Sequence, residues 1–157
     1  MNRRIRNEIN KHQTILTTKY ISNIENIYNT IQNELCFNVY IYSLNKSFKV
    51  YMKYPQEYPF CPPDIFINKY KYRSLIKSNK FNKNIINNIY GKNFCVCCHS
   101  ITCRDNWGPT LNSKNVLNEI VDNILIKIYC VDIFHAKKIF KKYNVIDDLS
   151  QEIIKYL

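Results

Sequence analysis

The chain has 157 residues and a formal net charge of +11 at pH 7, and 46% of its residues are hydrophobic. Only 2 glycines and 5 prolines, together with 14% aromatic residues, exclude a disordered tail. The composition therefore predicts a single folded domain over residues 1–157.

The lysines and arginines are scattered along the chain and do not form a basic run with interleaved aromatic residues. Such a run is typical of proteins that bind nucleic-acid phosphates and bases. We therefore expect a basic, solvated surface and no specific nucleic acid as a partner.

Two features argue against a membrane partner. No apolar run approaches the roughly 18 residues that a spanning helix needs, and the first residues, MNRRIRNEINKH, are charged instead of leading into an apolar signal core. The expected localisation is cytoplasmic and/or nuclear. In a reducing compartment the 7 cysteines are expected to be free thiols or metal ligands.

Residues 3–13 are expected to form the first helix, because Ile5 and Ile9 lie four positions apart on one face. An antiparallel meander is expected next, because apolar and polar residues alternate in neighbouring segments, with a turn at residues 44–47. Its apolar positions are Phe37, Val39 and Ile41 in one strand, Phe48, Val50 and Met52 in the next, and Ile65 and Ile67 in a third.

The second half of the chain predicts a polar excursion followed by helices. Residues 68–93 are expected to be irregular, with one short strand at most. After Pro109, Asn112 or Ser113 is expected to cap a helix, and two shorter helical patterns cover residues 133–143 and 147–157. The apolar stripe of the first of these helices consists of Val116, Leu117, Ile120, Ile124 and Leu125.

Three prolines mark a corner between two of the expected strands. Pro59, Pro62 and Pro63 fix backbone angles and remove amide donors, so this segment cannot continue a strand ladder and must turn at the surface. In order, the elements form an α+β layout: an N-terminal helix, a four-stranded antiparallel meander, a cysteine-bearing excursion and C-terminal helices.

Residues 47–67, SFKVYMKYPQEYPFCPPDIFI, and residues 104–120, RDNWGPTLNSKNVLNEI, are similar to two segments of the ubiquitin-conjugating enzymes. The first resembles that family's third strand, its Tyr-Pro-Phe-x-Pro-Pro signature and the following strand. The second resembles the Trp, the Pro and the apolar helix that follow the family's nucleophile. The resemblance implies the family's fold over most of residues 1–128, with a divergent helical part at residues 129–157.

The resemblance also implies a cysteine that accepts ubiquitin or a ubiquitin-like protein as a thioester from an activating enzyme. The carried protein would then pass to a lysine of a protein substrate, usually with a ubiquitin ligase. Residues 94–107 read FCVCCHSITCRDNW, and Cys95 is the expected nucleophile because of its Phe-Cys-Val setting. Cys98, which fits the family's distance to Trp107 better, and Cys97 stay alternatives.

The family carries an asparagine eight residues before its cysteine, in a His-Pro-Asn triplet credited with stabilising the oxyanion. Counting back from Cys95 reaches Asn87, without the neighbours of that triplet. Asn87 is therefore the expected catalytic amide. Because the triplet is missing, the alternative function is a catalytically inactive variant of the fold that acts as a ubiquitin-binding or cofactor module.

Two partner surfaces are implied by the resemblance. The activating enzyme is expected to meet Arg3, Arg4 and Arg6. The ligase-binding surface is expected to include Pro59, Phe60, Trp107 and Pro109.

A zinc site is the alternative interpretation of the cysteine-rich segment. Thiolates with one imidazole satisfy tetrahedral zinc, and the segment supplies such a set in Cys95, Cys98, His99 and Cys103. Against it, structural sites usually draw their ligands from two separated pairs. We therefore expect neither a metal nor another cofactor, and a zinc-dependent nucleic-acid protein is the more distant alternative.

Overall fold

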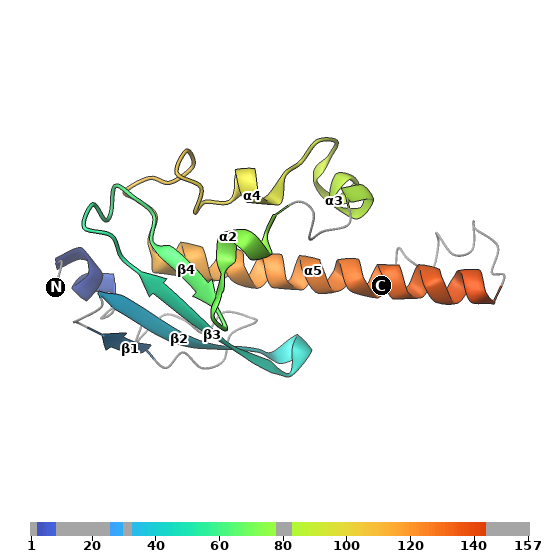
Figure 1. Cartoon of the computed structure of the whole chain (residues 1–157), viewed down its shortest axis with the longest axis horizontal. Coiled ribbons are helices and arrows are strands. Elements are labelled where there is room, and N and C mark those ends of the chain that lie inside the picture. Colours follow the sequence, from blue (N-terminus) through green and yellow to red (C-terminus); the bar gives the residue numbers. More distant parts are fainter. Residues whose placement is uncertain (1–2, 9–25, 30–32, 78–82, 144–157) are drawn as a thin grey trace.

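The computed structural model describes residues 3–8, 26–29, 33–77 and 83–143 (Figure 1). A helix at residues 3–8 precedes an antiparallel sheet, and three short helices separate the sheet from one long helix. The helices after the sheet are α2 (Tyr72–Leu75), α3 (Lys83–Tyr90), α4 (Val96–His99) and α5 (Ser113–Lys142). None of the described helices is long and apolar enough to cross a membrane.

The sheet is a meander in which each strand pairs with the next in antiparallel register. Its strands are β1 (Asn26–Asn29), β2 (Glu34–Ile41), β3 (Lys46–Lys53), β4 (Asp64–Ile67) and the two-residue β5 (Tyr70–Lys71). The expected α+β class is confirmed, with a short N-terminal helix, an antiparallel meander and a long helix near the C-terminal end.

Alternation along β2 and β3 builds one face of the core, as the sequence predicted. Every second residue of β2 is buried, and Phe37 pairs with Val50 while Leu35 pairs with Met52. Burial of such side chains contributes about 1.5–3 kcal/mol each. The register therefore places the apolar face of both strands toward the helices.

The turn between β2 and β3 lies at residues 42–45, two residues before its predicted position. Asn45 adopts a left-handed conformation with a φ of 49°, and its N–H bonds to the carbonyl of Tyr42. Asparagine tolerates this conformation, so the chain reverses there. Lys46 consequently begins β3 and pairs with Ile41.

The irregular excursion predicted for residues 68–93 is wrong for most of the residues described there. The segment contains β5, α2 and α3. Tyr72 in α2 and the pair Ile85 and Ile86 in α3 are buried. These few apolar residues stabilise the short helices by packing against the rest of the fold. The periodicity of a polar stretch does not predict such tertiary contacts.

Helix α5 begins where the sequence predicted and continues further. Asn112 is its N-cap, and the Asn112 side chain accepts hydrogen bonds from the backbone N–H groups of Lys114 and Asn115. The separate helix predicted at residues 133–143 is wrong, because no glycine or proline interrupts residues 113–142 and the buried stripe continues through Cys130 and Ile133. The C-terminal part of α5 extends beyond the sheet (Figure 1). The pattern at 147–157 and residues 9–13 of the first helix lie outside the described residues.

A buried carboxylate joins three distant segments. Glu8 is 6% exposed, and its Oε1 accepts hydrogen bonds from the Tyr58 hydroxyl and from Arg4 Nε at 2.9 Å. Its Oε2 accepts from the backbone N–H and the hydroxyl of Ser113, at 3.0 and 2.7 Å. Burial, and next the bond to Glu8, raises the pKa of Tyr58. The first helix, the proline corner and the start of α5 are thus held at one point.

The proline corner is also joined to the segment that follows the cysteines. Trp107 Nε1 donates a hydrogen bond to the carbonyl of Pro59 at 2.8 Å, and the indole ring is 8% exposed. The Tyr58 ring lies 6.1 Å from the Trp107 ring, centroid to centroid. Residues 48 positions apart therefore form one buried unit.

Replacing the buried carboxylate tests this account of the fold. We expect Glu8→Ala to lower the free energy of unfolding by about 3 kcal/mol or more, because the buried Tyr58 hydroxyl and both Ser113 donors lose their acceptor. Urea denaturation followed by circular dichroism measures the change. Glu57→Ala, at an exposed turn, is the control and should change stability by less than about 0.5 kcal/mol. A loss under about 1 kcal/mol in Glu8→Ala would contradict the role given to Glu8.

Candidate functional site: the thiol cluster of Cys95, Cys97 and Cys98

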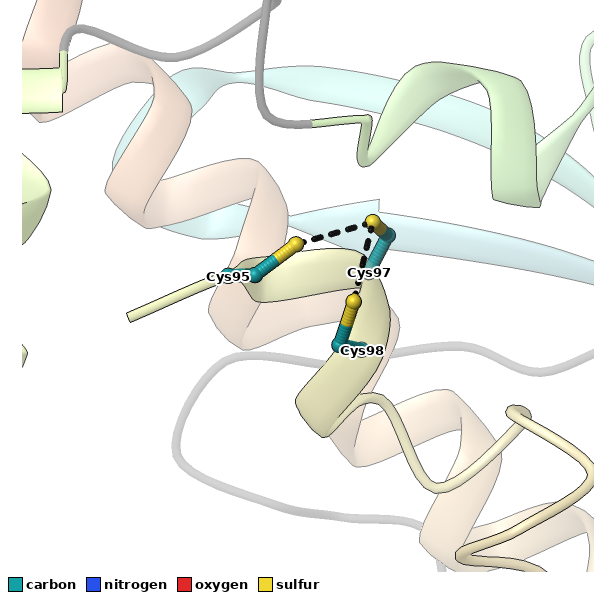
Figure 2. A group of neighbouring side chains, drawn as sticks. All are labelled: Cys95, Cys97 and Cys98. Atoms are coloured by element: carbon teal, nitrogen blue, oxygen red, sulfur yellow. Dashed lines mark hydrogen bonds between the residues drawn. The ribbon is translucent and has the colours of Figure 1, made fainter. Parts of the chain in front are cut away.

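Three thiols meet at the single helical turn α4. Cys95 is the N-cap of this turn, in an extended conformation, and Cys97 and Cys98 lie within the turn. The sulfur of Cys97 is 3.0 Å from that of Cys95 and 3.9 Å from that of Cys98, and all three sulfurs lie within 4.8 Å of one another (Figure 2). We call these residues the thiol cluster. Cys95 and Cys97 are half-buried and Cys98 is exposed.

Glu119 of α5 fixes the end of this turn. Its carboxylate accepts hydrogen bonds from the Ser100 hydroxyl at 2.7 Å and from the Ile101 backbone N–H at 2.6 Å. The same carboxylate accepts from the Tyr72 hydroxyl of α2 at 2.8 Å. Burial, and next the charge of Glu119, raises the pKa of Tyr72. A four-residue helix cannot satisfy its own terminal groups, so Glu119 of α5 holds the residues at its end from outside.

Asn106 secures the carbonyl groups that α4 leaves open. Its Nδ2 donates to the carbonyl of Cys98 at 2.7 Å and to that of Ser100 at 3.0 Å. The backbone that carries the thiol cluster is consequently held on its carbonyl side by Asn106 and on its amide side by Glu119.

An aromatic stack flanks the cluster. The rings of Tyr90 and Phe94 are stacked at 4.4 Å, and those of Phe94 and His99 at 4.2 Å. His99 Nδ1 lies 2.9 Å from the carbonyl of Cys95. Because a carbonyl only accepts, Nδ1 carries the proton in this contact. The stack and this bond fix the His99 ring beside Phe94.

Cys95 and Cys98 have opposite pKa shifts. Hydrogen bonds with Cys97, and next with Cys98, lower the pKa of Cys95 to about 7, because they stabilise its thiolate. The hydrogen bond to Cys95 raises the pKa of Cys98 to about 11, since the donor thiol keeps its proton. Cys95 therefore ionises before Cys98, and the thiolate is the nucleophilic form of cysteine.

The structure brings together the three candidate nucleophiles but not the four candidate zinc ligands. The alternative zinc set of Cys95, Cys98, His99 and Cys103 does not form one group, because among the described residues the group that could hold a metal consists of Cys95, Cys97 and Cys98. Cys103 is buried, with its sulfur 4.0 Å from Arg73 Nη2. The His99 ring is stacked on Phe94.

Asn87 lies in α3, and its side-chain oxygen Oδ1 is buried without a hydrogen-bond partner among the described residues. Among the described residues, no hydrogen bond joins the Asn87 side chain to Cys95. Its catalytic role stays a prediction.

The expected partner-binding residues differ in exposure. Arg3, Arg6 and Pro109 are exposed, and Phe60 is 76% exposed. Trp107 is buried and supports the corner through Pro59 instead of presenting its ring to a partner.

Arg4 is half-buried and bonded to Glu8, and this hydrogen bond raises its pKa. The first helix thus offers Arg3 and Arg6 more freely than Arg4.

Sequence reasoning missed Glu8, Glu119 and Asn106, which hold the site in place. Glu119 bonds across 18 residues to Ile101, and Glu8 bonds across 105 residues to Ser113. No local spacing signals such contacts, because each depends on how helices pack in the finished fold.

Comparisons of this chain with known protein families, with curated proteins and with solved structures found no match. The resemblance to the ubiquitin-conjugating enzymes therefore stays a prediction from the sequence.

The order in which the thiols react tests the electrostatics of the cluster. We expect Cys95 to be alkylated by iodoacetamide half-maximally near pH 7, and Cys98 only well above pH 9, since the thiolate is the reactive form. Reduced protein in chelator is labelled across this pH range, and the peptides are quantified by mass spectrometry. Exposure alone favours Cys98, so faster labelling of Cys98 at pH 7 would refute the assignment. In urea the difference should disappear.

Proposed function

We propose that this chain is a ubiquitin-conjugating enzyme that accepts ubiquitin or a ubiquitin-like protein on Cys95. The observation that carries the proposal is the hydrogen bond from Trp107 Nε1 to the carbonyl of Pro59. It joins the two sequence segments on which the resemblance rests, the proline corner and the segment that leads into α5. The cysteine-bearing segment runs between them and ends at this junction.

The surroundings of Cys95 suit a thiol that must accept and release an acyl group. The half-buried sulfur belongs to Cys95, the N-cap residue at the start of α4. The residues that follow are held by Glu119 and Asn106. A fixed backbone under a partly exposed thiol gives an incoming thioester a defined target.

The reaction would consist of two acyl transfers. The Cys95 thiolate attacks the thioester carbonyl of the charged activating enzyme, a new S–C bond forms, and the thiolate of the activating enzyme leaves. A substrate lysine amine then attacks the Cys95 thioester, an amide forms, the amine proton passes to solvent or a base, and the Cys95 thiolate leaves. No oxidant or reductant is needed.

Exposed side chains of the first helix and the proline corner suit the partner contacts of this proposal. Arg3 and Arg6 present cationic groups to an activating enzyme. Phe60 and Pro109 offer apolar surface near the Trp107 junction for a ligase. Apolar anchors of this kind contribute strongly to protein interfaces when a partner covers them.

A non-catalytic ubiquitin-binding or cofactor module is the second candidate. The missing His-Pro-Asn triplet favours it, because the resemblance assigns stabilisation of the oxyanion to the asparagine of that triplet. This candidate requires the same fold and partner surfaces but no thioester.

A charging assay decides between the two candidates. With activating enzyme, ATP, magnesium and ubiquitin, and with a chelator that binds soft metal ions but spares magnesium, we expect a reductant-sensitive adduct in wild type on a non-reducing gel. Cys95→Ser should lose that thioester or form a reductant-resistant oxyester, since a serine ester resists thiols.

Cys97→Ser and Cys98→Ser serve as matched controls and should keep a reducible adduct. Loss of the adduct only in one of these variants would move the nucleophile to that residue. Absence of an adduct in wild type with each of several ubiquitin-like proteins would reject catalysis and support the binding module.

A further inference from the structure

We propose that the thiol cluster is a three-thiolate binding site for a thiophilic closed-shell metal ion, Cu(I) or Zn(II). The inference stands on the positions of three sulfurs and not on the proposed function. It also differs from the alternative zinc set that the sequence suggests, because Cys97 replaces His99 and Cys103.

The sulfur positions are close to those that a single ion requires. A metal–sulfur bond of about 2.3 Å places ligand sulfurs about 4 Å apart around a trigonal or tetrahedral ion. The sulfurs of Cys97 and Cys98 are 3.9 Å apart, and those of Cys95 and Cys97 are 3.0 Å apart. The second pair must open by about 1 Å, and all three sulfurs lie within 4.8 Å of one another. Cys95 is the N-cap of α4, and rotation of its side chain leaves the backbone of the turn in place.

The three side chains point toward one common point. Figure 2 shows the three sulfurs as the corners of a triangle, with dashed lines from the sulfur of Cys97 to those of Cys95 and Cys98. Hydrogen bonds that Glu119 accepts and Asn106 donates fix the turn without using any of the sulfurs. The ligands are therefore preorganised while their donor atoms remain available.

The donor set selects the class of ion. Thiolate ligands favour Cu(I) and Zn(II) over oxygen-seeking ions such as magnesium and calcium. Three thiolates complete a planar site for Cu(I), whereas Zn(II) would take solvent as its fourth ligand. On binding, each S–H bond is replaced by a metal–sulfur bond, and its proton passes to the buffer.

Titration of the reduced, full-length chain with each metal tests the site. Cu(I) is added anaerobically against a competing chelator, and Co(II) is added as a spectroscopic substitute for Zn(II), with thiolate charge-transfer absorbance as the readout. We expect one ion per chain in at least one of the two titrations. The ion that binds identifies the occupant.

Variants separate this site from the zinc set suggested by the sequence. Cys97→Ser should weaken binding on the order of 100-fold or more, since loss of an outer-shell partner alone costs about 10- to 100-fold. His99→Ala and Cys103→Ser are the matched controls and should leave the affinity unchanged. Urea denaturation of each metal-free variant shows whether it folds.

Three outcomes would overturn the proposal: no stoichiometric binding of either ion by wild type, undiminished binding by folded Cys97→Ser, or binding that is lost in His99→Ala or Cys103→Ser. The readout requires neither activating enzyme nor ubiquitin. A failed charging assay with intact metal binding would therefore reject only the proposed function, and the converse result would reject only the metal site.

Discussion

The buried carboxylate of Glu8 is the constraint on which the site's geometry depends. A carboxylate offers about four acceptor positions, and here four donors from three segments occupy its two oxygens. Because Tyr58 is fixed, the adjoining Pro59 presents its carbonyl to Trp107. Because Ser113 is fixed, α5 begins at a set point and places Glu119 beneath Ser100. Ser100 in the middle of the cysteine-bearing segment and Trp107 at its end thus both depend on one side chain.

Glu119 is a second carboxylate that accepts several hydrogen bonds, here from Ser100 and Ile101 in the middle of the segment. Short helices such as α4 leave most of their terminal amides and carbonyls unsatisfied, and burying such groups unpaired costs about 1–3 kcal/mol each. Ser100 is 3% exposed, and its hydroxyl finds an acceptor in Glu119. The carboxylate also receives the Tyr72 hydroxyl. Two acids on two helices therefore position a segment that has little regular structure of its own.

The sequence predicts the parts of this molecule that depend on local periodicity. The alternation of Phe37, Val39 and Ile41 specifies the buried face of β2, and Asn112 marks the start of α5. The sequence also gathers four cysteines within residues 95–103. It does not predict which of them meet, because an extended Cys95 points its sulfur at Cys97, whereas a continuous helix would favour partners three or four residues away. The anchors at Glu8 and Glu119 escape prediction because their partners are distant in sequence.

The closeness of the three sulfurs links the two proposed chemistries. A thioester on Cys95 would lie beside the thiol of Cys97, at a sulfur separation of 3.0 Å in the free protein. The acyl group could then move between sulfurs by thiol exchange at little cost, since the bonds broken and formed are alike. A metal ion held by all three sulfurs would remove both the acceptor and its neighbour from this chemistry. If both proposals hold, acylation and metal occupancy would therefore be mutually exclusive states of one cluster, because both would use the sulfur of Cys95.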